Sequence, residues 1–292
     1  MANLTAKSSV VKRVLCVVIL TWCASVVYAQ DATEDALPTM TENTKVDTKN
    51  TKIEAEEVAK KLANPIANMV SVPLQYDYYG NMGPDKKGSS QVLLVQPVIP
   101  IDMKGGDNII LRPVVTSMWQ NNLNGFSGYG FNNVTLETFY TPNTGTSMMY
   151  GFGPVFVSPS GSSGYFGSQQ TGGGVTGVLL DRKGPWTYGT MAYQTWSLGG
   201  NGASGTQNNF YYQPFVAYVT HNAWTFTVVD QGNYNYDQHK AVNTYFFNIG
   251  KLVVHHKLPV NYTAGVSYTG TSTPGGAQGF GARAQITFAF PE

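Results

Sequence analysis

Three polar residues in the first half of the chain, Gln96, Arg112 and Glu137, could together sort solutes by charge or hydrogen bonding. Each lies on a stretch of alternating apolar and polar residues, at a similar distance from a short turn-like segment. Directly opposite residues of neighbouring antiparallel strands have Cβ atoms about 4.5 to 5.5 Å apart. The spacing therefore predicts an Arg112–Glu137 ion pair with Gln96 beside it. Such a pair would either form a selective constriction or merely neutralise two charges in a narrow lumen.

Three further polar residues, Lys251, Arg283 and Gln285, are weaker candidates for the same lumen. The closing segment 283–290 alternates strictly, so its large apolar side chains share one face and Arg283 and Gln285 share the other. The set of predicted pore-lining residues is Gln96, Arg112, Glu137, Lys251, Arg283 and Gln285.

Catalytic chemistry has weak support in the sequence. A lipid hydrolase would need a serine nucleophile and a histidine base that an Asn or Gln positions. The four histidines fall in predicted turns or loops, and none stands mid-strand beside an outward serine: His221, His239, His255 and His256. Adjacent His255 and His256 would point in opposite directions on a strand, so we expect no metal site there. The glycines at 172–174 lack the helix and lysine of a phosphate-binding loop, so no cofactor is expected.

The elements that must position these residues are strands. Runs of two-residue periodicity recur along the second part of the chain, and glycine, asparagine, aspartate and proline mark the connections. They predict strands at about 67–78, 89–101, 107–118, 128–140, 146–158, 171–181, 185–197, 207–219, 223–231, 241–253, 259–269 and 279–290.

The connections between these strands alternate between long and short. This is expected when one rim faces the outside and the other faces the periplasm, and a soluble β-sandwich has no reason to sort its loops in this way. The sequence therefore predicts an all-β fold, a transmembrane antiparallel up-and-down barrel of about 12 strands. Both termini would be periplasmic and the long loops extracellular. Pro97 and Pro113 each cost a ladder hydrogen bond, so a bulge or bend is expected at both.

Composition agrees with a barrel. Only 12% of residues are charged and 13% are aromatic, which does not suit a disordered chain. The mean hydropathy of -0.16 is compatible with a membrane, because only alternate residues of a spanning strand face lipid. Aromatic residues near predicted strand ends indicate interfacial girdles, and core packing in a soluble β-protein is the alternative.

The N-terminal part divides into three segments. Residues 1–29 have a basic start, an apolar core and a Val27-Tyr28-Ala29 end, which is typical of a signal peptide; a retained anchor is the alternative. Both cysteines lie there, so the mature chain has none. Residues 30–50 are expected to be a disordered linker. Residues 51–65 predict a short periplasmic helix ending at Pro65, either docked at the barrel mouth or a solvated tether.

Several motifs along residues 66–292, the expected barrel, and the preceding helix resemble a known family. The chain is similar to the Gram-negative outer-membrane barrels filed under the MetA pathway of phenol degradation, often labelled transporter or neuromedin U-like. The resemblance covers about residues 60–292 and implies uptake of aromatic or other hydrophobic compounds, with no catalytic or binding residue to carry over. The closing Pro291-Glu292 departs from an aromatic end. The motifs are KKLANPIANMVSVPLQYDY at 60–78, VQPVIPI at 95–101, GPW at 184–186, WSLGGNG at 196–202, QPFVAYV at 213–219, IGK at 249–251 and FAFP at 288–291.

These observations favour an outer-membrane barrel for passive passage of small solutes, with hydrophobic or aromatic compounds as the first class. The alternatives are a closed structural or adhesive barrel without through-flow and, least favoured, an outer-membrane lipid hydrolase. The expected partners are outer-membrane lipid, small solutes and the barrel-assembly machinery, which would engage the C-terminal strand. The chain has 18 basic and 17 acidic residues, and no basic patch suggests nucleic acid. The sequence gives no oligomeric state.

Overall fold

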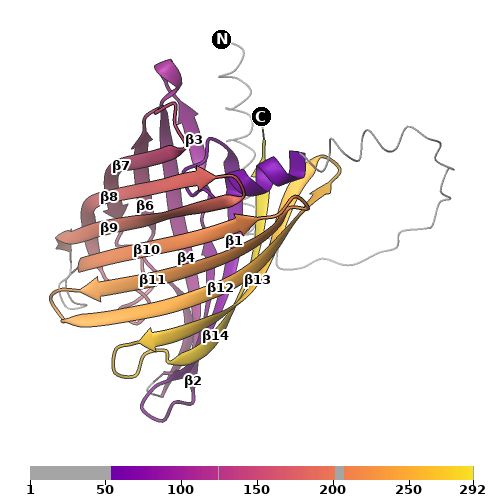
Figure 1. The fold of residues 1–292 in the computed structure, drawn as a ribbon. Coiled ribbons are helices and arrows are strands. Elements are labelled where there is room, and N and C mark those ends of the chain that lie inside the picture. The colour runs from indigo at the N-terminus through magenta and orange to yellow at the C-terminus, as the bar shows by residue number, and fades with distance from the viewer. Residues whose placement is uncertain (1–53, 124, 201–206, 292) are drawn as a thin grey trace, which may run out of the picture. The chain divides into compact units, whose positions relative to one another are not determined.

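The computed structural model describes residues 54–123, 125–200 and 207–291. The expected signal peptide, the expected linker and the first three residues of the expected helix lie outside these ranges. Within them, residues 54–62 form a helix and most of the remaining chain forms strands (Figure 1). No helix in the described ranges has both the length and the apolar character needed to cross a membrane.

The strands form one antiparallel sheet that closes on itself, because the first strand pairs with the last. The strands are β1 (Val70–Met82), β2 (Gly88–Val95), β3 (Ile99–Asp102), β4 (Asn108–Leu123), β5 (Phe126–Phe131), β6 (Thr135–Thr141), β7 (Met148–Val157), β8 (Gln170–Lys183), β9 (Trp186–Gly200), β10 (Asn208–Val219), β11 (Trp224–Asn235), β12 (Lys240–His255), β13 (Leu258–Thr271) and β14 (Gly279–Phe290).

Two interruptions reconcile these 14 segments with the twelve strands that the sequence predicts. β2 and β3 both pair with β4, and β5 and β6 both pair with β4 on its other side, so each couple is one barrel strand with a break. The described chain therefore forms a closed barrel of twelve antiparallel strands. The predicted fold class is confirmed.

The first break accommodates both strand prolines. β4 pairs with β2 as far as Val95 and with β3 from Ile99 in the same register, which puts Pro97 opposite Pro113. Neither proline has an N–H to give to the ladder, so facing each other they share a single gap. An interruption is thus present at Pro97, whereas Pro113 lies inside continuous β4 and needs no bulge of its own.

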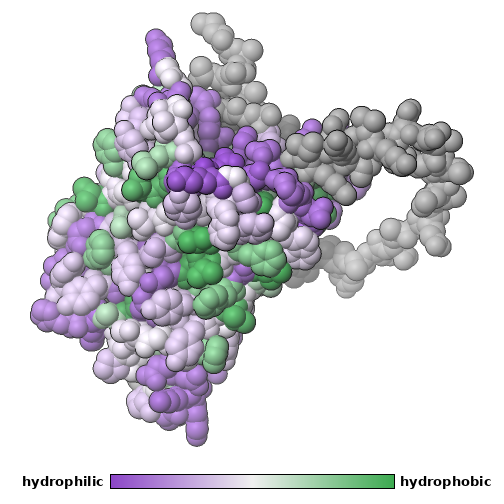
Figure 2. Space-filling model, in the orientation of Figure 1, coloured by the Kyte–Doolittle hydropathy of each residue, from purple (hydrophilic) through white to green (hydrophobic). Residues whose placement is uncertain are grey.

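The two faces of the wall differ as a lipid-facing barrel requires. Outward side chains include many large apolar residues that are exposed, and Figure 2 shows hydrophobic side chains across the middle of the visible face. In β12 the sequence leaves the register open between two phenylalanines. The structure resolves this: Phe246 is fully buried inside the barrel and Phe247 is 53% exposed outside. An outward apolar face stabilises a barrel in lipid and would be unfavourable in water.

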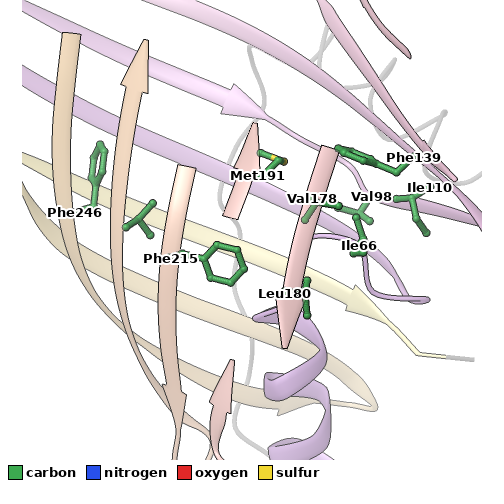
Figure 3. Close-up of a cluster of buried hydrophobic side chains, with 10 residues drawn as sticks. Ile66, Val98, Ile110, Phe139, Val178, Leu180, Met191, Phe215 and Phe246 are labelled. Carbon is green, nitrogen blue, oxygen red and sulfur yellow. The ribbon is translucent and has the colours of Figure 1, made fainter. Parts of the chain in front are cut away.

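The inner face carries a buried apolar cluster of its own, drawn in Figure 3. It gathers inward side chains from β4, β6 and β8 to β12, together with Val98 in the break between β2 and β3 and Ile66, which follows the helix. The cluster consists of Ile66, Val98, Ile110, Phe139, Val178, Leu180, Met191, Phe215, Val229 and Phe246. The lumen is therefore partly filled by hydrophobic side chains.

The two rims differ less in loop length than the sequence suggests. The helix rim, where β1 begins and β14 ends, carries the connections predicted to be short, and the loop rim carries the others. Several predicted long loops continue as paired strands, so that only residues 124 and 125 separate β4 from β5. Backbone pairing to neighbouring strands explains the extension, because it does not depend on side-chain hydropathy. Residues 158–169 remain an extended connection.

Close strand packing makes one glycine of β8 sensitive to substitution. A Cβ at Gly174 would lie 1.8 Å from the backbone oxygen of Gln194 on β9. We expect Gly174→Ala to lower the free energy of unfolding by about 1 to 3 kcal/mol, because backbone must move. Chemical unfolding of the protein in lipid vesicles measures this. Gly177→Ala, on the same strand, is the control, since the nearest atom to its Cβ would be 3.8 Å away; equal stabilities of the two variants would contradict the prediction.

Candidate functional site: a polar belt across the lumen

Arg112 and Glu137 face each other inside the barrel, as the sequence spacing predicts. They are directly opposite in the β4–β6 register, and Arg112 Nη1 donates to Glu137 Oε2 at 2.9 Å. Arg112 Nη2 donates to Gln96 Oε1, also at 2.9 Å. Both charged side chains are largely buried, at 13% and 4% exposed, so neither charge is screened by bulk water.

Gln96 reaches this pair because it stands in the break between β2 and β3. Its backbone N–H donates to the carbonyl oxygen of Pro73 on β1 at 3.1 Å. Val98 and Ser71 exchange two backbone hydrogen bonds, which hold the same segment. The proline-induced gap in the ladder therefore leaves Gln96 fixed to β1 while its side chain turns to Arg112.

A second buried ion pair joins the first and last strands. Arg283 Nε donates to Asp77 Oδ1 at 2.7 Å and Arg283 Nη2 to Asp77 Oδ2 at 2.9 Å. The side chains are only 6% and 3% exposed. The guanidinium carbon lies 3.5 Å from the centroid of the Phe246 ring, a cation–π arrangement. A two-point contact of this kind fixes both charges in position.

Glutamine side chains connect the two ion pairs into one network. Gln75 Nε2 donates to Asp77 at 2.8 Å, and Gln96 Nε2 lies 3.5 Å from Gln75 Oε1. Arg283 also donates to Gln231 across the lumen at 3.2 Å. We call this network the polar belt: Gln75, Asp77, Gln96, Arg112, Glu137, Tyr211, Gln213, Gln231 and Arg283.

The polar belt separates two cavities. The helix-side cavity has a volume of about 220 Å³ and the loop-side cavity about 540 Å³. Both are bounded by the same four belt residues, namely Gln75, Gln96, Arg112 and Gln231. Arg112 also reaches Met191 Sδ on the far wall at 3.1 Å. The belt is therefore the narrow point between two chambers of one lumen.

The helix of residues 54–62 bounds the helix-side cavity. Ala59 is 2% exposed and packs against Val219, Ala223 and Leu252 of the helix rim. Leu62 and the residues that follow line the cavity itself. The helix is therefore docked at the barrel mouth, which is one of the two alternatives that the sequence leaves open, and is not a solvated tether.

Polar contacts at the rim support this docking. Glu56 accepts from Lys60 Nζ at 2.8 Å and lies 3.0 Å from His221 Nδ1. The hydrogen bond from Lys60 lowers the pKa of Glu56, opposed by partial burial and aided by His221, so this carboxylate is charged at neutral pH. His221 is 96% exposed, and such a pair adds little to the apolar contact.

With this geometry in view, comparison with known proteins identifies the type of fold. No family model and no curated protein sequence matches the chain. An outer membrane channel from Pseudomonas putida F1 has a similar structure, with a TM-score of 0.61 and 9% identity, over 76% of this chain and 95% of that one. The outer membrane phospholipase A of Escherichia coli has a TM-score of 0.43 and 10% identity, over 77% of this chain and 99% of that one. A Pseudomonas aeruginosa FadL homologue has a TM-score of 0.35 and 7% identity, over 77% of this chain and 90% of that one.

The fold is that of an outer-membrane barrel. The similarity to the Pseudomonas putida channel covers nearly all of that protein, whereas the identity of 9% is too low to transfer any residue role. The similarity therefore establishes the fold alone.

The six residues predicted to line the lumen do not all do so. Arg283 lines the helix-side cavity, as does Gln285, which donates to Thr287 Oγ1 at 2.9 Å. Lys251 is the exception: its ammonium hydrogen-bonds the carbonyl oxygen of Asn222 and lies 5.3 Å from the centroid of the Trp224 ring. Its neighbours Gly250 and Leu252 take the inner positions of β12, so the prediction for Lys251 was wrong by one residue in register.

Sequence reasoning missed Asp77, the partner of Arg283. The alternation around it carries a signal, since Tyr76 and Tyr78 are exposed outside and Asp77 must point inward. Its pairing with Arg283 depends on how the first strand meets the last, 206 positions away. No local pattern specifies that closure, so the ion pair could not be derived from the sequence.

The described residues offer little for catalysis. No hydrogen bond joins a serine to a histidine within the described ranges; His221 contacts Glu56 and His255 contacts the hydroxyl of Tyr262. Nor does the part of the chain that the structure describes hold a group of three or more His, Cys, Asp or Glu that could bind a metal. The belt's arginines and carboxylates are paired with each other. The arrangement offers hydrogen-bond donors and acceptors and paired charges toward the lumen.

Proposed function

We propose that this protein sits in the outer membrane of a Gram-negative cell and lets small solutes cross passively through its lumen. The observation that carries the proposal is the polar belt between two cavities inside a closed barrel. Discrimination at the belt would come from hydrogen bonding and paired charges. In this proposal both chain ends, with the helix, are periplasmic and the loop rim is extracellular. No cofactor is needed.

Hydrophobic or aromatic compounds are the first solute class that we propose. The buried apolar cluster around the belt, including Phe215, Val229 and Phe246, gives the lumen apolar surface along which such compounds could move. The similar protein from Pseudomonas putida is an outer membrane channel, and the resemblance to the family filed under phenol degradation points the same way. The proposed pore-lining residues are Gln96, Arg112, Glu137, Arg283 and Gln285.

Liposome swelling with sugars, amino acids and aromatic acids tests passage, and the docked helix supplies a decisive variant. We expect Ala59→Arg to increase swelling rate severalfold, because an arginine does not fit among Val219, Ala223 and Leu252 and displaces the helix. Lys61→Ala is the control, since Lys61 is exposed on the same helix. A protein that admits no solute class, with or without the helix displaced, would refute passage.

The second candidate, a closed barrel without through-flow, rests on the same belt. Hydrogen bonds span the lumen from Arg283 to Gln231 and from Arg112 to Met191. If these contacts are permanent, the barrel is structural or adhesive. The Ala59→Arg experiment separates the two candidates, because a sealed belt keeps the swelling rate at background even when the helix is displaced.

A further inference from the structure

The loop-side cavity is lined by an unusual number of carboxamide side chains. Seven of them lie outside the polar belt and converge there from two strands and three connections. They are Asn132, Asn133, Gln207, Asn209, Asn233, Asn235 and Gln238. A carboxamide offers two donors and an acceptor and carries no charge, so this chamber presents a dense, neutral hydrogen-bonding surface.

Some of these amides fix the shape of the cavity. Gln207 donates to Ser168 Oγ at 2.5 Å and to the carbonyl oxygen of Gln170 at 2.8 Å. Asn235 donates to Asn209 Oδ1 at 2.9 Å. Such contacts hold the polar groups in fixed positions before any ligand arrives, which lowers the entropic cost of binding.

Other groups lining the cavity are free to bind a ligand. Among the residues that the structure describes, the Asn233 carboxamide and the Tyr193 hydroxyl have no hydrogen-bond partner in the protein. Both side chains are half-buried, and neither is among the fully buried polar groups without a partner, so their polar atoms face the open space of the cavity. These two therefore mark where a ligand's polar groups would sit.

A tyrosine pair gives the same cavity an aromatic wall. Tyr193 of β9 and Tyr211 of β10 are directly opposite in register, with ring centroids 4.8 Å apart and an angle of 17° between the rings. Val92, Leu94 and Val114 of β2 and β4 line the cavity as well. A flat ligand with C–H groups on its faces fits against such apolar surfaces, and its edges meet the amides.

The charged groups that border the cavity are already neutralised. Arg112 pairs with Glu137, and Asp77 pairs with Arg283. A charged ligand would lose its hydration without finding a free counter-charge. A purely hydrophobic ligand would leave the polar groups of Asn233 and Tyr193 unpaired, at a cost for each. The cavity thus favours a neutral ring with several hydroxyl groups on its edge.

We propose that the loop-side cavity binds a neutral sugar of one or two rings. The ring faces lie against the aromatic and aliphatic walls, and the hydroxyl groups exchange hydrogen bonds with the carboxamides. The volume of about 540 Å³ accommodates a molecule of this size. Binding in this cavity does not require that the sugar crosses the belt, so it goes beyond the proposed passage of solutes.

Isothermal titration of the detergent-solubilised full chain with maltose tests the proposal. We expect saturable binding of maltose and no binding of glucuronate at matched concentration. Tyr193→Ala and Asn233→Ala are each expected to weaken maltose binding at least about tenfold, which corresponds to about 1.4 kcal/mol. Tyr193→Phe keeps the aromatic ring and should lose less maltose affinity than Tyr193→Ala. Tyr150→Ala is the control, because Tyr150 is 41% exposed on the outer face.

Each variant is first checked for the folded barrel by its heat-dependent mobility in gel electrophoresis. Absence of maltose binding to the folded parent protein would overturn the proposal. Equal weakening by Tyr150→Ala would overturn it too, as would toluene binding that depends on Tyr193 when maltose does not bind. Maltose binding without liposome swelling, in the parent protein and in Ala59→Arg alike, supports the site and refutes passage. Swelling without maltose binding supports passage and refutes the site.

Discussion

Asp77→Ala should lower the free energy of unfolding by roughly 3 to 5 kcal/mol, because it leaves the Arg283 guanidinium buried without its counter-charge. Arg283 is 6% exposed in the pair and makes two contacts shorter than 3 Å to the Asp77 carboxylate. Its remaining partners, Gln231 and the Phe246 ring, carry no negative charge. Chemical unfolding in lipid vesicles, followed by tryptophan fluorescence, measures the change.

Two controls isolate the cause. Lys183→Ala removes an ion-pair partner whose side chain is 70% exposed, and we expect it to cost at most about 1 kcal/mol. The double variant Asp77→Leu with Arg283→Met removes both charges and should recover most of the loss, because a buried pair replaced by apolar residues is often neutral. A double variant as unstable as Asp77→Ala would show that packing, not an unpaired charge, is responsible.

The same ion pair marks where sequence reasoning ends. Alternation around Asp77 and within the closing segment 283–290 predicts that both Asp77 and Arg283 face inward. Which residue each one meets depends on the stagger between the first and last strands, and a closed barrel sets that stagger through all twelve strands together. The Arg112–Glu137 pair was accessible because the two residues lie on consecutive predicted strands at a similar distance from a short turn, which places them at the same height in the wall.

Strand positions were largely predictable for a related reason. A wall with lipid outside and protein inside imposes a two-residue period on every strand, and this period is visible in the sequence. Strand ends were less predictable, since β9 extends to Gly200 and β11 to Asn235 through polar residues. The prediction that Lys251 lines the lumen failed because two adjacent phenylalanines obscured which residues of β12 point inward. Only the neighbouring strands select Phe246 for the interior.

Arg112→Ala should raise the conductance of the belt and give it a preference for cations. The substitution removes the side chain that joins Gln96, Glu137 and Met191, and it leaves Glu137 as an unpaired negative charge beside the passage between the two cavities. The Coulomb energy between that carboxylate and a monovalent ion about 8 Å away is about 2 kcal/mol at an effective dielectric constant near 20. Salt screening reduces this energy, so we expect a cation preference of roughly tenfold. Planar-bilayer recordings in a potassium chloride gradient give the conductance and the reversal potential.

The opposite substitution provides the sharpest control, because it keeps the geometry and changes the sign. Glu137→Gln leaves the Arg112 charge unpaired, so its reversal potential should shift towards anion selectivity, in the opposite direction to Arg112→Ala. The double variant Arg112→Ala with Glu137→Gln should conduct more than the parent protein without a strong ion preference. A structural pair outside the conduction path would move none of these reversal potentials. Unchanged conductance and selectivity in all three variants would therefore leave the ion pair with a structural role alone.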